Sequence, residues 1–190
     1  MARFTRAELD AYRGVTVPDL LPDGDLRLLF VGINPGLWTA AVQTHFAHPV
    51  NRFYPALYEA GIITERIDPA AGTSPDQRRH ITDRGIGICN LVQRATARAD
   101  ELTKAELIEG AAALAELVEA RRPKVVAVAG ITAYRVAFTR PKAVEGRQTE
   151  TIGGSILWVV PNSSGLNAHE TVASLAIKYA EPARVAGVIQ

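Results

Sequence analysis

Three stretches of the chain consist almost entirely of apolar residues and have the length of single strands. They span residues 26–32, 86–92 and 125–130, and the first and third end at Gly32 and Gly130. Short continuous apolar runs are typical of parallel strands buried on both faces, whereas strands with one wet face alternate apolar and polar residues. The pattern therefore predicts a buried, mainly parallel sheet.

Helical patterns lie between and after these strands. The longest predicted helix spans residues 103–122, because Thr103-Lys104-Ala105-Glu106 has the capping-box pattern that begins helices. The other expected helices are residues 51–60, 131–138 and 169–184.

A hairpin is expected over residues 149–161, turning at Gly153-Gly154 with residues 156–160 as its inner strand. Strands that alternate with helices indicate a sheet covered on both faces. The sequence therefore predicts an α/β fold: a single three-layer αβα domain over residues 1–190 with a mainly parallel central sheet. Residues 1–25 are expected to form an N-terminal extension.

Two loops stand where such sheets bind ligands, after the carboxyl ends of strands. One is residues 33–36 and the other residues 162–166. In the first loop, proline restrains the backbone after Asn34, and the flanking glycines allow a ligand to approach the main chain closely. The side-chain carbonyl of Asn34 can orient a water there, although an amide is a poor base. The alternative is that this loop is only a turn.

The composition is that of a folded soluble protein: 190 residues, 47% hydrophobic and 22% charged, with a net charge of +1. The single cysteine, Cys89, excludes an intrachain disulfide, a Cys-ligated zinc site and a four-cysteine iron–sulfur cluster. No apolar run reaches the ~18 residues of a membrane helix, and Met1–Asp10 lacks the apolar segment of a secretory signal. We therefore expect a soluble cytoplasmic protein without a membrane partner, associated with the nucleoid if bacterial.

Charge is distributed unevenly along the chain. Residues 121–148 contain seven basic residues and one acidic residue, whereas residues 91–120 contain three basic and six acidic residues. Such asymmetry either makes one face attractive to phosphates or belongs to solvated loops and helix ends.

Several common chemistries lack their motifs. There is no GxxxxGK[ST] or GxGxxG loop to bind nucleotide phosphates. Ser163 and Ser164 lie near His169, but no GxSxG motif of a hydrolase encloses either serine. A metal site is left only as an assembly of residues distant in sequence, because the histidines form no HExxH motif and no i, i+4 pair. The histidines are His45, His48, His80 and His169.

Three further motifs follow one another along the chain. They are Gly32-Ile33-Asn34-Pro35-Gly36-Leu37, Phe46-Ala47-His48-Pro49-Val50-Asn51-Arg52-Phe53 and Pro161-Asn162-Ser163-Ser164-Gly165-Leu166. Together with residues 87–92 and 129–134 they resemble the mismatch-specific uracil/thymine-DNA glycosylases of the uracil-DNA glycosylase superfamily. The resemblance covers about residues 26–179 and implies that family's fold and an enzyme that flips a base out of DNA.

The resemblance also implies a role for each pocket residue. Asn34 positions the attacking water, and Phe46 stacks on the flipped base while main-chain groups near Ile33 and Phe46 hydrogen-bond to the edge of the base. Asn90 and His45 lie near the same pocket with roles left open. The alternatives are a core phenylalanine at Phe46 and a surface histidine at His45.

The third motif corresponds to the family's wedge. Leu166 enters the base stack where the base leaves. Gly165 and Asn167 place main-chain groups against the guanine left behind, and Ser164 belongs to the same DNA-binding loop. The alternative is a buried leucine at the start of the last helix.

These roles imply a monofunctional DNA glycosylase of base excision repair that removes uracil, preferably opposite guanine. Ethenocytosine is a further expected substrate, and thymine a weak one because Thr39 crowds its methyl group. No cofactor and no metal is implied, and the matched motifs contain no lysine that would form a Schiff base. The expected partners of this monomer are double-stranded DNA with a mispaired uracil and the abasic-site product. Phosphate contacts are expected from neutral loop groups and from the basic residues of 121–147.

Two alternatives remain at this point. One is a non-catalytic module that binds mismatched or abasic DNA. The other is an α/β hydrolase of small molecules that uses Ser163 or Ser164.

Overall fold

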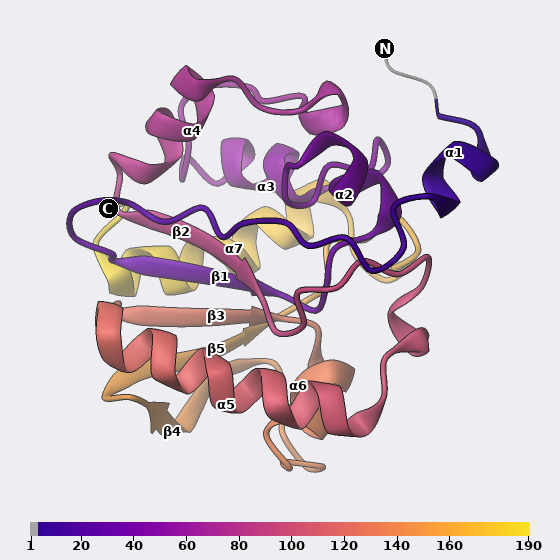
Figure 1. The fold of residues 1–190 in the computed structure, drawn as a ribbon. Coiled ribbons are helices and arrows are strands. Elements are labelled where there is room, and N and C mark those ends of the chain that lie inside the picture. Colours follow the sequence, from indigo (N-terminus) through magenta and orange to yellow (C-terminus); the bar gives the residue numbers. More distant parts are fainter. Residues whose placement is uncertain (1–3) are drawn as a thin grey trace.

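A computed structural model describes residues 4–190 (Figure 1). Within them, five strands form one sheet in the order β2-β1-β3-β5-β4, and all neighbours pair in parallel except β4 and β5. The strands are β1 (Leu28–Gly32), β2 (Ile86–Asn90), β3 (Val125–Ala129), β4 (Gly146–Ile152) and β5 (Ser155–Val160). The predicted α/β fold with a mainly parallel sheet is confirmed.

Helices cover both faces of the sheet, so the predicted three layers are confirmed (Figure 1). Alternate residues of the buried strands point to opposite faces. In β1, Leu28 and Phe30 pack in the core under α3 and α7, whereas Leu29 and Val31 pack in the core under α5 and α6. These helices are α3 (Phe53–Glu59), α5 (Lys104–Arg121), α6 (Ile131–Ala137) and α7 (Val172–Ala186).

Three short helices were not predicted. They are α1 (Arg6–Asp10), α2 (Leu37–Val42) and α4 (Pro75–Thr82), and two single 3₁₀ turns add Pro69–Ala71 and Ala99–Glu101. Only Ile81 of α4 is buried, so this helix shows no apolar periodicity. It nevertheless begins with a capping box, in which Ser74 and Gln77 each accept a hydrogen bond from the other's main-chain nitrogen.

The N-terminal segment covers the free edge of β2. Leu20 and Ile88 exchange two main-chain hydrogen bonds of 2.9 and 2.7 Å in an antiparallel bridge, and Val17 is buried. Residues of the expected extension therefore pack on the sheet and shield an edge that would otherwise be open to pairing with another chain.

The hairpin and the last helix lie close to their predicted positions. Gly153 and Gly154 have φ values of +51° and +83°, as the expected turn requires, and β5 lies inside β4. The last helix starts at Val172 rather than at 169, because Thr171 is its N-cap and accepts a hydrogen bond of 3.1 Å from the Ser174 nitrogen. The loop after β5 is consequently longer than predicted.

Helix α5 packs closely on the end of β2 through Gly110. A Cβ at Gly110 would lie 2.2 Å from the carbonyl oxygen of Leu91, which is far inside van der Waals contact. The Leu91 nitrogen in turn donates a hydrogen bond of 2.9 Å to the Gly32 carbonyl. A glycine in the middle of a helix is therefore required here by packing.

We expect Gly110→Ala to lower the free energy of unfolding by about 1–3 kcal/mol, because α5 or the strand end must move. Helix propensity alone predicts the opposite sign, a gain of about 1 kcal/mol. Urea denaturation followed by circular dichroism measures the difference. The control is Ala112→Gly on the exposed face of α5, which should lose only about 1 kcal/mol. A stabilised Gly110→Ala variant would show that this contact does not limit the packing.

Candidate active site

Asn34 follows β1 and is held with a defined orientation of its amide. Its Nδ2 donates to the Arg94 carbonyl (3.0 Å), the Pro35 carbonyl (3.2 Å) and Thr96 Oγ1 (2.7 Å). Thr96 donates its own hydroxyl proton to the Arg98 carbonyl, so its oxygen must accept from Asn34. No hydrogen bond within residues 4–190 uses Asn34 Oδ1. This oxygen is therefore available to accept a hydrogen bond from a water.

Phe46 stacks one face of its ring on Phe53, with ring centroids 4.0 Å apart and an angle of 20° between the planes. The side chain is half-buried, and φ is +56°, an unusual value for a residue other than glycine. Such strain of about 1–3 kcal/mol is often found at functional positions. Phe46 packs against the core without being enclosed by it.

Gly32 leaves the space in which two pocket residues meet. A Cβ at Gly32 would lie 2.5 Å from Asn90 Oδ1 and 3.1 Å from Phe46 Cζ. Gly32 and Asn90 are register partners at the carboxyl ends of β1 and β2. Ile33 continues from Gly32, and its side chain packs toward Gly130 at the end of β3. The structure thus brings Asn90 and the edge of the Phe46 ring together as expected.

His45 is buried, with 4% of its surface exposed, so the alternative of a surface histidine is wrong. Its Nε2 lies 3.0 Å from the Pro18 carbonyl, and its Nδ1 lies 3.1 Å from Asn90 Nδ2. A carbonyl only accepts, so Nε2 carries the proton and Nδ1 accepts from the Asn90 amide. Burial lowers the pKa of His45 to about 4. His45 is therefore a neutral group that orients Asn90 and has no ring nitrogen left for a ligand.

The loop between β5 and α7 carries the predicted wedge residue, and we call residues 162–170 the wedge loop. Leu166 is 91% exposed, so the alternative of a buried leucine is wrong. Hydrogen bonds within the loop shape it: Asn162 Oδ1 accepts from the Ser164 nitrogen (2.9 Å), and Asn167 Nδ2 donates to the Asn162 carbonyl (2.9 Å). Gly165 leaves no room for a side chain, since a Cβ would lie 2.5 Å from Val50 Cγ2.

The serines of this loop do not form a hydrolase site. Ser163 is fully buried, and Ser164 Oγ accepts a hydrogen bond from the Leu166 nitrogen at 3.3 Å. His169 is exposed, and within residues 4–190 its side chain makes no hydrogen bond to either serine. The arrangement lacks the nucleophile–base contact of a Ser-His site.

The basic residues of the run at 121–148 do not all lie at one end of the sheet, so the run as a whole does not form one phosphate-facing surface. Residues 121–124 precede β3 and lie at the amino ends of the parallel strands, away from Asn34. Arg140 is paired with Glu150 at 2.9 Å, and Arg135 donates to the carbonyl that follows Lys142. The sheet separates these charges because the run spans the whole of β3.

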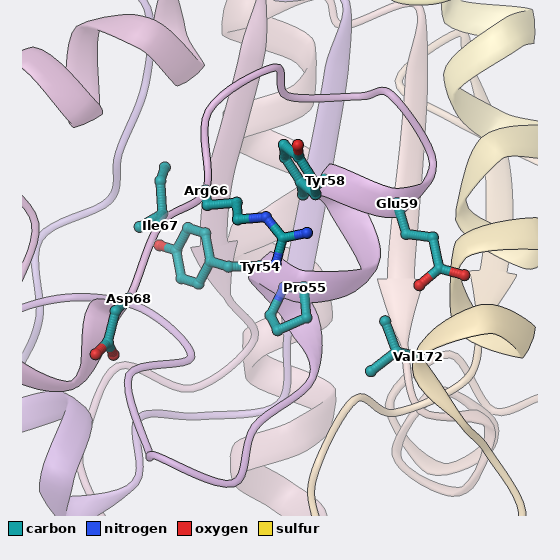
Figure 2. A pocket seen from close by; sticks show the side chains of 8 residues that line it. All are labelled: Tyr54, Pro55, Tyr58, Glu59, Arg66, Ile67, Asp68 and Val172. Carbon is teal, nitrogen blue, oxygen red and sulfur yellow. The ribbon is translucent and has the colours of Figure 1, made fainter.

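Two cavities are lined in part by Tyr54 of α3. One of about 390 Å³ lies between α3, residues 66–68 and Val172, where the Arg66 guanidinium sits 4.7 Å from the ring centre of Tyr58 (Figure 2). The other, of about 130 Å³, is bounded by His45 and Asp19. Neither is lined by Asn34 or Phe46, the residues predicted to position the water and to stack on the base.

Some residues that hold the predicted site residues in place were not identified from the sequence. Thr96 orients Asn34, and Arg52 was noticed only as part of a motif, although its guanidinium contacts the wedge loop. Gln93, which follows β2, donates a hydrogen bond of 3.2 Å to Asp19, and burial raises the pKa of that carboxyl. No local pattern signals these contacts, because each joins segments distant in sequence.

Residues 4–190 contain no group of three or more His, Cys, Asp or Glu side chains placed to hold a metal ion. Among the helices of the same residues, none combines the length and the apolar character needed to cross a bilayer.

Comparison with known proteins shows which fold and family the chain shares. In structure, the chain is similar to a protein of Methanosarcina acetivorans that was solved by solution NMR and described as a candidate uracil DNA glycosylase. The TM-score is 0.60 at 16% identity, over 92% of this chain and 98% of the other, which supports the shared fold. The sequence model of the uracil DNA glycosylase superfamily matches residues 18–181, well over half of the chain. The protein therefore belongs to the uracil DNA glycosylase superfamily.

Proposed function

We propose that this superfamily member is a monofunctional, mismatch-specific DNA glycosylase that removes uracil opposite guanine and leaves an abasic site. The observation that carries the proposal is the orientation of the Asn34 amide. Three acceptors engage its nitrogen, and within residues 4–190 no hydrogen bond engages its oxygen at the carboxyl edge of the sheet. A single hydrogen-bond acceptor held in this way suits the positioning of a water.

The base is proposed to stack on the open face of Phe46. Base–aromatic stacking contributes about 1–3 kcal/mol, which offsets part of the cost of removing a base from the duplex. Asn90 Nδ2 is occupied by His45, so Oδ1 faces Gly32 and the Phe46 ring edge. An acceptor at this place suits the imide N–H of uracil and disfavours cytosine, whose corresponding nitrogen carries no hydrogen.

In the proposed reaction, the bond between C1′ of the deoxyribose and N1 of uracil breaks first, and its electron pair leaves with the uracil anion. A water then adds through its oxygen to C1′ of the oxocarbenium-like sugar and loses a proton to solvent. Protonation of the anion releases uracil. Asn34 accepts a hydrogen bond from the water and directs it at C1′ without removing its proton, so catalysis comes from positioning and electrostatics.

A preference for mispaired uracil follows because Asn34 positions the water but does not act as a base. Without a carboxylate at the position of Asn34, the enzyme depends on a base that already leaves the helix at low cost. Leu166 projects into solvent, as a side chain that enters a base stack must. The main-chain groups of Gly165 make no hydrogen bond within residues 4–190 and are proposed to contact the unpaired guanine. Thymine is proposed to be a poorer substrate, and ethenocytosine a further one.

We expect Asn34→Ala to lower the single-turnover rate on U:G duplexes by about 10²-fold or more, the scale of one positioned catalytic group. Thr96→Val keeps the volume but removes one acceptor that orients the amide, so a loss of about tenfold is expected. Quenched-flow excision assays measure both rates, with U:A, T:G, ethenocytosine:G and single-stranded uracil as comparison substrates.

Binding of both variants to abasic DNA should stay near that of the wild type, which separates chemistry from affinity. An unchanged rate in Asn34→Ala would refute the proposed role of Asn34. Tight mismatch binding without excision of any base by the wild type would instead identify a DNA-binding module.

The buried His45 makes stability depend on pH. Its pKa is about 4 in the folded protein and near 6.5 when unfolded, so the unfolded state binds the proton more readily between these values. The stabilising contribution is complete above pH 6.5 and is lost as the pH falls toward 4. We expect about 2 kcal/mol of this loss between pH 7 and pH 5.

Urea unfolding at both pH values tests this dependence. His45→Gln should show a smaller loss than the wild type, whereas His169→Gln, at an exposed histidine, should show the same loss. Identical pH slopes in all three proteins would mean that His45 is not buried in its neutral form.

A further inference from the structure

Arg52 joins the segment before α3 to the wedge loop. Its guanidinium donates to the carbonyls of Ser164 (2.6 Å), Asn167 (2.7 Å) and Glu170. These carbonyls lie on both sides of Leu166 in the sequence. One side chain therefore closes the loop that carries the exposed leucine.

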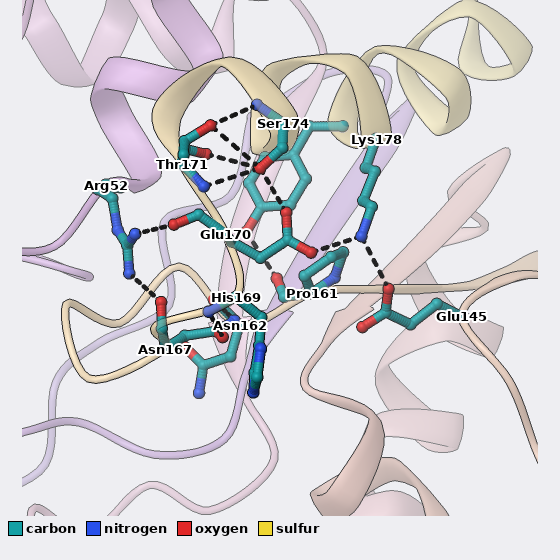
Figure 3. Close-up of polar contacts among 11 residues, drawn as sticks. Arg52, Glu145, Pro161, Asn162, Asn167, His169, Glu170, Thr171, Ser174 and Lys178 are labelled. Carbon is teal, nitrogen blue, oxygen red and sulfur yellow. Dashed lines mark hydrogen bonds and ion pairs between the residues drawn. The ribbon is translucent and has the colours of Figure 1, made fainter.

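The contacts of Arg52 are directed at the main chain (Figure 3). The carboxylate of Glu170 points elsewhere, to Lys178 at 2.5 Å and Ser174 at 2.6 Å. Arg52 Nε is buried and has no hydrogen-bond partner among the residues that the structure describes. Arg52 thus gives up hydration without gaining a carboxylate partner, and its hydrogen bonds constrain loop conformation.

The chain segment that contains Arg52 also supports the ring of Phe46. Phe53 follows Arg52 directly and stacks under Phe46. The Arg52 nitrogen donates to the Ser163 carbonyl at 3.0 Å, and Val50, 59% exposed, packs against Gly165. Residues 50–53 therefore connect the two loops: Val50 and Arg52 contact the wedge loop, and Phe53 contacts the Phe46 ring.

We propose that Arg52 is a positioning residue that makes the wedge loop stiff and sets the place of Leu166 relative to Phe46. This inference rests on the proposed function, because it assigns a partner, the stacked DNA duplex, to the exposed leucine. A flexible loop would have to be ordered each time it enters the base stack, and this cost would oppose flipping. A loop already held by Arg52 is ordered before it meets DNA.

The contribution of Arg52 to the excision rate should depend on whether the uracil is stacked in the duplex. A uracil in an unpaired bubble is already out of the stack, so its excision needs Asn34 and Phe46 but no wedge. Arg52 should therefore matter for U:G duplexes and be nearly irrelevant for uracil in a bubble. A merely structural role would lower both rates together.

The experiment compares single-turnover excision by Arg52→Lys from a U:G duplex and from the same sequence with uracil in a three-nucleotide bubble. Lysine keeps the charge but lacks the planar fork that reaches several carbonyls. We expect a loss of about tenfold or more on the duplex and a change within about twofold on the bubble. In a Leu166→Ala background, Arg52→Lys should cause no further loss on the duplex. Equal losses on both substrates, or additive losses in the double variant, would overturn the proposal.

Two controls keep the result interpretable. Arg84→Lys removes a guanidinium that donates to a main-chain carbonyl outside the wedge loop, that of Ile62 at 2.7 Å, so its ratio of duplex to bubble rates should match the wild type. Melting temperatures show whether Arg52→Lys is folded. Should it unfold, Arg52→Gln is measured at a temperature where it is folded, with the same expected ratio.

A readout without chemistry separates this inference from the proposed function. Fluorescence of 2-aminopurine next to the mismatch reports unstacking when protein binds. Unstacking that is weaker for Arg52→Lys than for the wild type supports the inference even if no base is excised. Normal unstacking by Arg52→Lys together with normal binding would overturn it, whatever the wild-type activity.

Discussion

Parallel pairing of β1 with β2 is the constraint on which the candidate site depends. It brings Gly32 and Asn90 into register at the carboxyl edge of the sheet. Because Gly32 has no Cβ, the Asn90 amide and the rim of the Phe46 ring meet above it, and the following turn carries Asn34 to the same edge. A parallel sheet supports this convergence because its strands end together, and helices on both faces keep those ends rigid.

The candidate site contains uncharged amide side chains, and hydrogen bonds fix which end of each amide donates and which end accepts. The two ends of a side-chain amide are nearly equal in shape, so packing alone does not decide which end faces a ligand; the partners decide it. Thr96 and two carbonyls engage the Asn34 nitrogen, and the neutral His45 ring engages that of Asn90. Within residues 4–190, neither amide oxygen takes part in a hydrogen bond. Groups of this kind act by orienting a partner and not by exchanging protons with it.

Much of the fold was predictable from local patterns. Continuous apolar runs indicated β1, β2 and β3, the capping box at Thr103 marked the start of α5, and two adjacent glycines marked the hairpin turn. The misses have local causes as well. Helix α4 buries only Ile81, so no apolar periodicity marked it, and it was missed despite the capping pair Ser74 and Gln77. The last helix starts late because the chain before Thr171 forms part of the wedge loop, whose Glu170 carbonyl is bonded to Arg52.

The sequence by itself determined the strands and the main helices, and its motifs marked Asn34, Phe46 and Leu166 as candidate site residues. Only the tertiary structure decided how these residues are held. It buried His45 between Pro18 and Asn90, and it turned the Asn34 amide toward Thr96. The physical reason is range: strands, caps and turns are encoded by neighbours a few positions apart, whereas these contacts join segments separated by 27, 45 and 62 positions. Such pairs meet only after the sheet has formed and the helices have packed on it.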